Sequence, residues 1–188
     1  MNAGRAIGAP LTWNVAGLLA EDPGATRDYD VAGVTIDLGE DLRLADPIEG
    51  HVRLSRTNRG LLVSASFSTS LQAECSRCLR EIEVPIEVSI DEEALPSIDL
   101  HSGQPVPVES DDEFEPIRLT DHHELELETP VREAIQLEEP IAALCREDCP
   151  GLCATCGNPL DEGTHDHPTD DVDPRLEALR DFHPIDGG

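Results

Sequence analysis

Apolar and polar residues alternate with a period of two along consecutive stretches in the first half of the chain. Residues 61–71, LLVSASFSTSL, place apolar side chains and Thr69 on one face and four serines on the other. Residues 82–90, IEVPIEVSI, repeat the alternation with glutamates outward. Such alternation predicts strands with one buried face. The expected inward residues are Val63, Ala65, Phe67, Thr69, Leu71, Ile82, Val84, Ile86, Val88 and Ile90.

A third strand is expected just before these two. Residues 50–57, GHVRLSRT, lead into the turn residues Asn58 to Gly60, which join them to the serine-rich strand. Residues 27–33 and 34–44 provide one or two shorter candidates. The first ninety residues are therefore expected to form an antiparallel β meander, as a curved sheet or a partly open barrel.

The pattern changes after the meander. Residues 96–120 carry many acidic residues and four prolines without any period, which is typical of a loop or linker. We expect one domain in three parts: a β-rich half (1–95), an acidic, proline-rich linker (96–120) and a helical, cysteine-rich part (121–183).

Two short helices are predicted in the last part, so the expected fold class is α+β. Thr129 and Pro130 suit the cap and first turn of one helix, which ends before Pro140. Asp173 suits the cap of a second helix in residues 173–182, DPRLEALRDF. The expected buried residues are Val131, Ala134 and Ile135 in the first helix and Leu176, Leu179 and Phe182 in the second.

Composition limits the size of the core. Of the 188 residues, 38% are hydrophobic and only 3% aromatic. A modest core of this kind often needs a metal or a disulfide to stabilise it.

The charge is large and uneven. The chain has 40 acidic residues against 13 arginines and no lysine, for a net charge of −27. Residues 91–188 hold most of this negative charge. Such a surface repels nucleic acid and anionic membranes and attracts basic proteins. A simple contribution to solubility is the other interpretation.

No targeting or membrane segment is expected. The N-terminal stretch MNAGRAIGAPLTWNVAGLLA is interrupted by polar residues and proline, and no run reaches the roughly 18 apolar residues of a membrane span. We therefore expect a cytoplasmic protein, in which paired cysteines indicate metal binding more often than disulfides.

The cysteines and two histidines form the strongest chemical signal. Two CxxC pairs, one at the tip between the two long strands and one directly before Gly157, have the spacing of zinc knuckles. We therefore predict a zinc-binding segment near the C-terminus. The predicted metal ligands are Cys75, Cys78, Cys145, Cys149, Cys153, Cys156, His165 and His167.

Eight ligands suffice for two tetrahedral sites, and they can be divided in more than one way. In the division we favour, the first four cysteines form one site that joins the hairpin tip to the segment after the helix, and the last four ligands form a local site. Alternatively, the two CxxC knuckles face each other as in a zinc ribbon. A third possibility is a single zinc, with the two histidines in solvent.

An enzyme is a poorer interpretation. Thiolate-rich zinc sites are usually closed and structural, whereas catalytic zinc keeps an open position. A thioredoxin-like CxxC would require a βαβ setting, and the chain has no glycine-rich phosphate loop, nucleophile elbow or HExxH motif.

Arginines lie near both ends of the meander, so they do not form one patch. The arginine between the first two cysteines either offsets thiolate charge or contacts an RNA phosphate. Any direct RNA contact is expected through Arg53, Arg56, Arg59, Arg77 or Arg80.

Four stretches in this order resemble the YceD family, the large ribosomal RNA subunit accumulation proteins: ECSRCLREIEVPIEV, VREAIQLEEP, LCREDCPGLCATCGNPLDEGTHDH and DPRLEALRDF. The resemblance covers most of residues 11–183. It implies metal binding by the six cysteines and a link to accumulation of large-subunit ribosomal RNA. Relatives with the long cysteine cluster often have CxC at 165–167, which supports a site using the two histidines. In many bacteria the gene of the YceD-family member neighbours the gene of a small zinc-containing large-subunit ribosomal protein.

These features together predict a non-enzymatic zinc-binding factor in large-subunit assembly. Its expected partner is a basic large-subunit ribosomal protein or a pre-ribosomal particle, and no small-molecule substrate is expected. The alternative is a zinc-ribbon module that binds nucleic acid or associates with transcription. A metal-dependent or redox enzyme is a third hypothesis.

Overall fold

The computed structural model describes residues 11–100, 102–107, 116–167 and 175–176. Its main sheet has five strands in the order β2-β4-β5-β6-β7, and a further strand, β3, pairs with β5. The strands are β2 (Thr26–Val34), β3 (Arg43–Leu44), β4 (Ile48–Arg56), β5 (Leu61–Glu74), β6 (Glu81–Leu95) and β7 (Ile117–Arg118). The predicted α+β class with an antiparallel meander is confirmed, and the sheet is not closed into a barrel.

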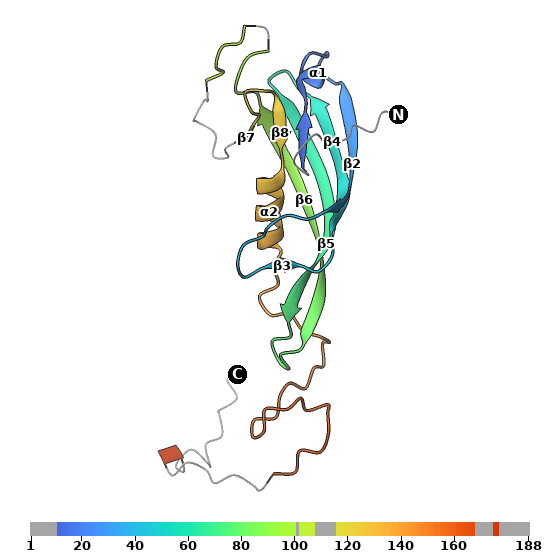
Figure 1. The fold of residues 1–188 in the computed structure, drawn as a ribbon, viewed down its shortest axis with the longest axis vertical. Helices are drawn as coiled ribbons and strands as arrows, with labels where there is room; N and C mark the ends of the chain where they lie inside the picture. The colour runs from blue at the N-terminus through green and yellow to red at the C-terminus, as the bar shows by residue number, and fades with distance from the viewer. Residues whose placement is uncertain (1–10, 101, 108–115, 168–174, 177–188) are drawn as a thin grey trace, which may run out of the picture.

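The two longest strands form a tall hairpin that runs along the long axis of the molecule (Figure 1). β5 and β6 pair antiparallel from Leu61 opposite Ala94 to Glu74 opposite Glu81. β4 accompanies β5 only as far as Ser68. The turn of the hairpin therefore extends beyond the rest of the sheet, and this turn carries the first CxxC pair.

The alternation in the sequence correctly identifies the buried face of this hairpin. All five inward residues predicted on β5 are buried. On β6, Ile86, Val88 and Ile90 are buried, whereas Ile82 and Val84 are only partly buried. These two lie near the end of the hairpin, beyond β4.

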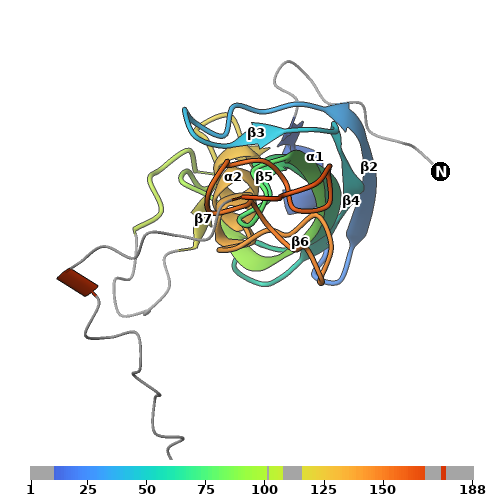
Figure 2. The same ribbon diagram turned by 90° about the horizontal axis from the view of Figure 1, so that it is seen from below.

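A helix packs against β6 and covers part of the core. α2 (Glu128–Leu137) buries Val131 and Ile135, as predicted, whereas the third predicted residue, Ala134, is only partly buried. The helix begins earlier than predicted, because Leu127 occupies the N-cap position without a side-chain cap and Thr129 lies inside the first turn. Seen from below, the strands curve around the helices (Figure 2).

The segment before β2 also belongs to the core, a feature that was not predicted from the sequence. β1 (Thr12–Asn14) pairs with β8 (Glu124–Glu126), and α1 (Ala16–Leu19) follows. The Trp13 and Tyr29 rings pack with their centroids 5.5 Å apart. The alternating apolar residues Leu11, Trp13 and Val15 were the available signal, and all three are buried.

Parts of the segment 96–120 join the sheet rather than forming a free linker. Ile117 in β7 pairs in parallel with Ala94, and Leu119 is only 1% exposed. The Ser97 hydroxyl donates to the Leu119 carbonyl at 2.6 Å. The sequence did not predict this contact, because the few apolar residues of the segment lie among acids and prolines and show no period. The predicted second helix lies outside the described residues, except for residues 175 and 176, and Leu176 is 53% exposed rather than buried as predicted.

No helix in the described ranges has both the length and the apolar character needed to cross a membrane.

Candidate metal centres

The first CxxC pair forms a tight turn at the tip of the β5-β6 hairpin. The Cys75 N–H donates to the Arg80 carbonyl, and the Leu79 N–H donates back to the Cys75 carbonyl, both at 2.8 Å. Leu79 closes the turn with φ at +58°, a left-handed conformation that is unusual for a branched apolar residue. The turn therefore has the form of a zinc knuckle.

The second CxxC pair has the same backbone arrangement. The Cys153 N–H donates to the Asn158 carbonyl, and the Gly157 N–H donates to the Cys153 carbonyl, both at 2.8 Å. Gly157 has φ at +71° and occupies the position that Leu79 occupies in the first turn. Two turns of the same form thus lie 78 residues apart in the sequence, from Cys75 to Cys153.

Backbone contacts bring the remaining cysteines to the hairpin tip. The Ser76 N–H donates to the Ala143 carbonyl at 2.8 Å, and the Arg77 guanidinium donates to the Cys149 carbonyl at 3.0 Å. Gly151 adopts φ of +81°, and a Cβ atom there would lie 3.2 Å from the Arg77 carbonyl oxygen. The chain after α2 is therefore held tightly against the first knuckle.

Four sulfur atoms meet at this contact. The Sγ atoms of Cys75, Cys78, Cys145 and Cys149 all lie within 4.8 Å of one another. The Sγ atoms of Cys75 and Cys149 are 3.8 Å apart, and those of Cys78 and Cys145 are 3.7 Å apart. A tetrahedral zinc with bonds of about 2.3 Å to sulfur separates its ligands by about 3.8 Å. The four-cysteine group therefore has the dimensions of a zinc site.

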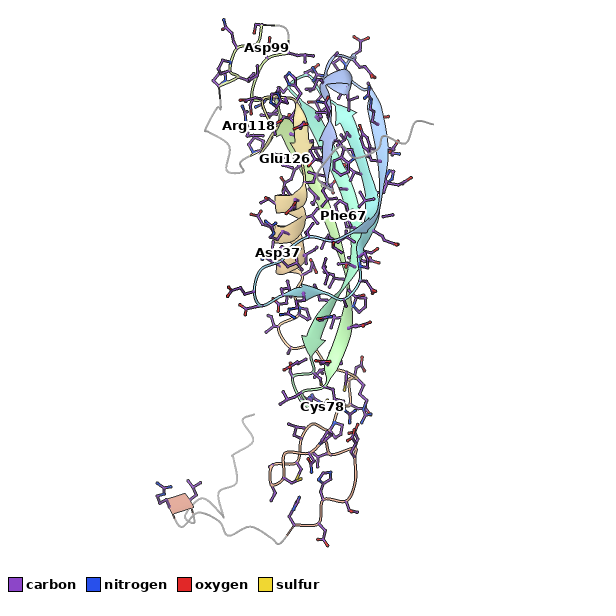
Figure 3. The ribbon with its side chains drawn as sticks, viewed as in Figure 1. Asp37, Phe67, Cys78, Asp99, Arg118 and Glu126 are labelled. Atoms are coloured by element: carbon purple, nitrogen blue, oxygen red, sulfur yellow. The ribbon has the colours of Figure 1, made fainter. Side chains whose placement is uncertain are left out.

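The surroundings of the four-cysteine group favour thiolate at one position. Figure 3 shows Cys78 at the lower end of the long sheet, and Cys75, Cys78 and Cys149 are buried. Hydrogen bonds from the backbone N–H of Cys145, and then of Arg77 and Cys78, lower the pKa of Cys75 to about 6. The neighbouring Cys149 thiol, together with burial, raises the pKa of Cys145 to about 12. Four thiols this close cannot all ionise without a cation to offset their charge.

The second knuckle meets the two histidines. The ligand atoms of Cys153, Cys156, His165 and His167 also lie within 4.8 Å of one another. The Cys156 Sγ and His165 Nδ1 atoms are 3.5 Å apart. A tetrahedral zinc with bonds of about 2.3 Å to sulfur and about 2.0–2.1 Å to nitrogen separates such a pair by about 3.5 Å.

The histidine environments suit ligation. His165 Nε2 lies 3.0 Å from the Pro159 carbonyl oxygen. If Nε2–H donates to that carbonyl, the Nδ1 atom is left free to ligate, a common outer contact of metal-bound histidines. The Nε2 atom of His167 is buried and has no hydrogen-bond partner within the described part of the chain. A metal ligated through this atom would satisfy it.

The Cys153 thiol lies in a similar setting to Cys75. Hydrogen bonds from the backbone N–H groups of Cys156 and Thr155 lower the pKa of Cys153 to about 6. Cys75 and Cys153, the first cysteine of each knuckle, therefore both have a lowered pKa, because backbone N–H groups are directed at their sulfur atoms.

The structure thus groups all eight predicted ligands as in the division we favour. The two CxxC pairs belong to different groups, so they do not face each other as in a zinc ribbon. Residue spacing alone left this open, because both divisions use the same residues.

Most of the candidate RNA-binding arginines make internal contacts. Arg53 pairs with Asp28, and Arg56 donates to the carbonyls of Leu19, Thr57 and Gly60. Arg77 donates to the Cys149 carbonyl, and Arg80 pairs with Asp161 and Glu162. Arg59 is exposed and has no ion pair to any residue that the structure describes. The ion pairs of Arg80 with Asp161 and Glu162 connect the first knuckle to the loop that carries the second group. Sequence alone did not reveal this contact.

The sequence matches the family described as large ribosomal RNA subunit accumulation protein YceD over residues 63–183. The chain belongs to the YceD family. It is 31% identical over 183 residues to the uncharacterized protein Mb2951c of Mycobacterium bovis and to Rv2926c of Mycobacterium tuberculosis, covering 94% of this chain and 83% of each relative. The uncharacterized protein ML1660 of Mycobacterium leprae is 32% identical over 139 residues, or 72% of this chain and 59% of that protein. No solved structure matches.

The YceD match begins within β5 and includes every residue of both groups. The segment that carries the family assignment is therefore also the segment that carries the candidate metal centres.

Proposed function

We propose that this YceD-family protein is a cytoplasmic, non-enzymatic zinc-binding factor that supports accumulation of large-subunit ribosomal RNA. The single observation that carries this proposal is the match over residues 63–183 to the family of large ribosomal RNA subunit accumulation proteins. Zinc is proposed because the ligand atoms of each group lie within 4.8 Å of one another and are sulfur and nitrogen donors, which suit zinc better than magnesium or calcium.

The proposed role of zinc is structural. The four-cysteine group supplies four thiolates, which leaves a tetrahedral ion no position for substrate. It joins the hairpin tip to a segment about seventy residues further along the chain, where few apolar residues are available for packing. Zinc would therefore hold the acidic second half against the sheet.

The proposed partner is a basic large-subunit ribosomal protein or a pre-ribosomal particle that displays one. The net charge of −27 supports this choice, because it attracts basic proteins and repels phosphates. The internal contacts of four of the five candidate arginines argue against a broad RNA surface. Arg59 is the remaining candidate for direct contact with RNA.

Metal analysis tests the first part of the proposal. Elemental mass spectrometry of protein purified under reducing conditions should find about two zinc ions per chain. A metal content near zero would contradict zinc binding at either group.

Depletion in cells tests the second part. Loss of the protein should lower the amount of large-subunit ribosomal RNA relative to small-subunit RNA. Purified wild type should also bind basic large-subunit ribosomal proteins more tightly than ribosomal RNA fragments, measured separately at two salt concentrations. Tight, salt-sensitive binding to RNA without affinity for basic proteins would favour the alternative nucleic-acid-binding module.

A further inference from the structure

A cleft of about 1000 Å³ lies beside the end of the β5-β6 hairpin, between the sheet and the metal-binding segment. One part of its lining is the chain around β3, from Asp41 to Arg43, and another is the chain after α2, with Glu139, Pro140, Ile141 and Ala143. In Figure 1, β3 lies just below α2, and the chain after α2 descends past it toward the hairpin tip. None of the eight candidate ligands lines the cleft, although Glu74 and Ser76 of its lining flank Cys75.

The lining combines apolar and acidic side chains. Leu42, Leu71 and Ala143 are buried apolar residues of the lining, and Ile141 is fully exposed. Five exposed acids also line the cleft against one arginine, and none of the five forms an ion pair with a residue that the structure describes. These acids are Asp41, Glu74, Glu81, Glu83 and Glu139.

An exposed isoleucine beside unpaired carboxylates is costly to leave in water and suits a specific kind of ligand. Apolar side chains gain about 25 cal/mol for each Å² that they remove from water. Unpaired carboxylates attract cationic groups and repel phosphates within the Debye length of about 8 Å. A protein segment with both basic and apolar side chains satisfies both properties, whereas the carboxylates repel RNA and anionic membranes.

We propose that this cleft binds a basic segment of a partner protein, with apolar side chains in the cleft and arginine or lysine against its acidic rim. The inference rests on the proposed function and deepens it, because it assigns the basic partner a binding site.

The four-cysteine group positions one wall of the cleft. Ala143 lies two residues before Cys145, and its carbonyl accepts the hydrogen bond from the Ser76 N–H at the hairpin tip. Metal bound at the four cysteines would therefore hold the residues from Glu139 to Ala143 in place. Removal of the metal should weaken binding of the basic segment even where the sheet remains folded.

A defined peptide tests the site directly. The probe is a short fluorescent peptide of alternating arginine and leucine, added to the full-length, zinc-loaded protein. A peptide of alternating arginine and serine is the control for charge alone. We expect the leucine peptide to bind about tenfold more tightly, which corresponds to about 1.4 kcal/mol. Equal binding of the two peptides would overturn an apolar contribution from the cleft.

Matched variants locate the site. Asp41→Asn combined with Glu139→Gln should weaken binding of the leucine peptide about tenfold. The control is Asp91→Asn combined with Glu87→Gln, which removes the same charge from exposed positions of β6 and should weaken binding less than about twofold. Equal losses would show diffuse attraction to an acidic surface and would overturn the proposal.

An apolar pair gives a second test. Ile141→Ser should weaken binding several-fold, whereas Leu62→Ser should not, because Leu62 is 43% exposed near the opposite end of β5. Both positions are exposed, so neither change should impair folding. Binding of a fluorescent ribosomal RNA fragment to wild type that Ile141→Ser weakens several-fold would identify RNA as the occupant and overturn the proposal.

Failure of the cleft and failure of the proposed function give different results. If wild type binds basic ribosomal proteins and the cleft variants bind them equally well, the cleft is not the binding site, whereas the proposed function is not contradicted. If zinc content and ribosomal RNA levels contradict the function while the peptide tests succeed, the cleft has another basic partner.

Discussion

At the scale of single residues, the two knuckles place different residues, Leu79 and Gly157, in the same left-handed backbone conformation. Gly157 adopts its left-handed conformation at no steric cost, whereas Leu79 adopts nearly the same conformation at a cost of about 1–2 kcal/mol. Leu79 is also 59% exposed, so little burial offsets that cost.

Leu79→Gly is therefore expected not to destabilise the protein, because relief of the strained φ offsets the extra flexibility of glycine in the unfolded chain. Leu79→Val should lower the free energy of unfolding by about 1 kcal/mol, because a branched Cβ fits the left-handed region worse. Urea unfolding of both variants is the measurement. A clear loss of stability in the glycine variant would mean that the leucine side chain makes an important contact.

A second residue-scale prediction concerns pH. His51 lies between two carboxylates, with Nδ1 3.1 Å from Asp30 and Nε2 3.0 Å from Asp28. Hydrogen bonds to Asp30 and then to Asp28 raise the pKa of His51 above its ordinary value of 6.5. The stabilisation from these pairs is therefore fully present below pH 6.5 and is lost as the pH rises through the raised pKa.

NMR titration of the His51 ring measures this pKa directly. Asp30→Asn should bring the pKa of His51 back toward 6.5 and reduce the loss of stability at higher pH. His122 serves as the reference, because it is exposed and forms no ion pair with a carboxylate of the described residues. A His51 pKa at or below that of His122 would contradict the prediction.

At the scale of elements, α2 is held by a narrow apolar face. Val131 and Ile135 are fully buried, whereas Leu137 at the end of the helix is 85% exposed. The helix has no side-chain cap at its N-terminus, so packing against the sheet must supply most of its stability.

Ile135→Ala is expected to lower the free energy of unfolding by about 2–4 kcal/mol, because it leaves a cavity between α2 and the sheet. Leu137→Ala is the matched control and should change it by less than about 0.5 kcal/mol. Denaturant titration with circular dichroism compares the two. Similar losses in both variants would indicate that α2 packs differently from the arrangement described.

At the scale of the whole molecule, the hydrophobic core and the metal segment are separate units. Cys75, Cys78 and Cys149 form a small cluster with Ile82 and Leu152, apart from the main core. The main core contains Trp13, the only tryptophan of the chain.

This separation predicts how the two metal groups differ. Cys149→Ser should increase hydrogen exchange across residues 140–167 and at the hairpin tip, because the four-cysteine group joins these segments. His165→Ala should increase exchange only within residues 153–167. Trp13 fluorescence should stay that of a buried ring in both variants. Equal exchange patterns in the two variants would contradict separate roles for the two groups.

The sequence by itself determined the features that depend on near neighbours. The period-two alternation identified the buried face of β5 and most of that of β6, because strand geometry sends successive side chains to opposite faces. The CxxC spacing identified both knuckles, because a tight turn brings two sulfurs together whatever surrounds it.

Only the tertiary structure decided which distant segments meet. Pairing of β1 with β8, burial of Leu119 and the cleft between residues 41–43 and 139–143 all join parts of the chain with no shared local pattern. The same holds for the eight ligands, because spacing allowed two divisions of the same residues and the contact between Ser76 and Ala143 selects one. Local sequence sets the conformation of each turn and strand, whereas their long-range contacts depend on packing of the whole chain.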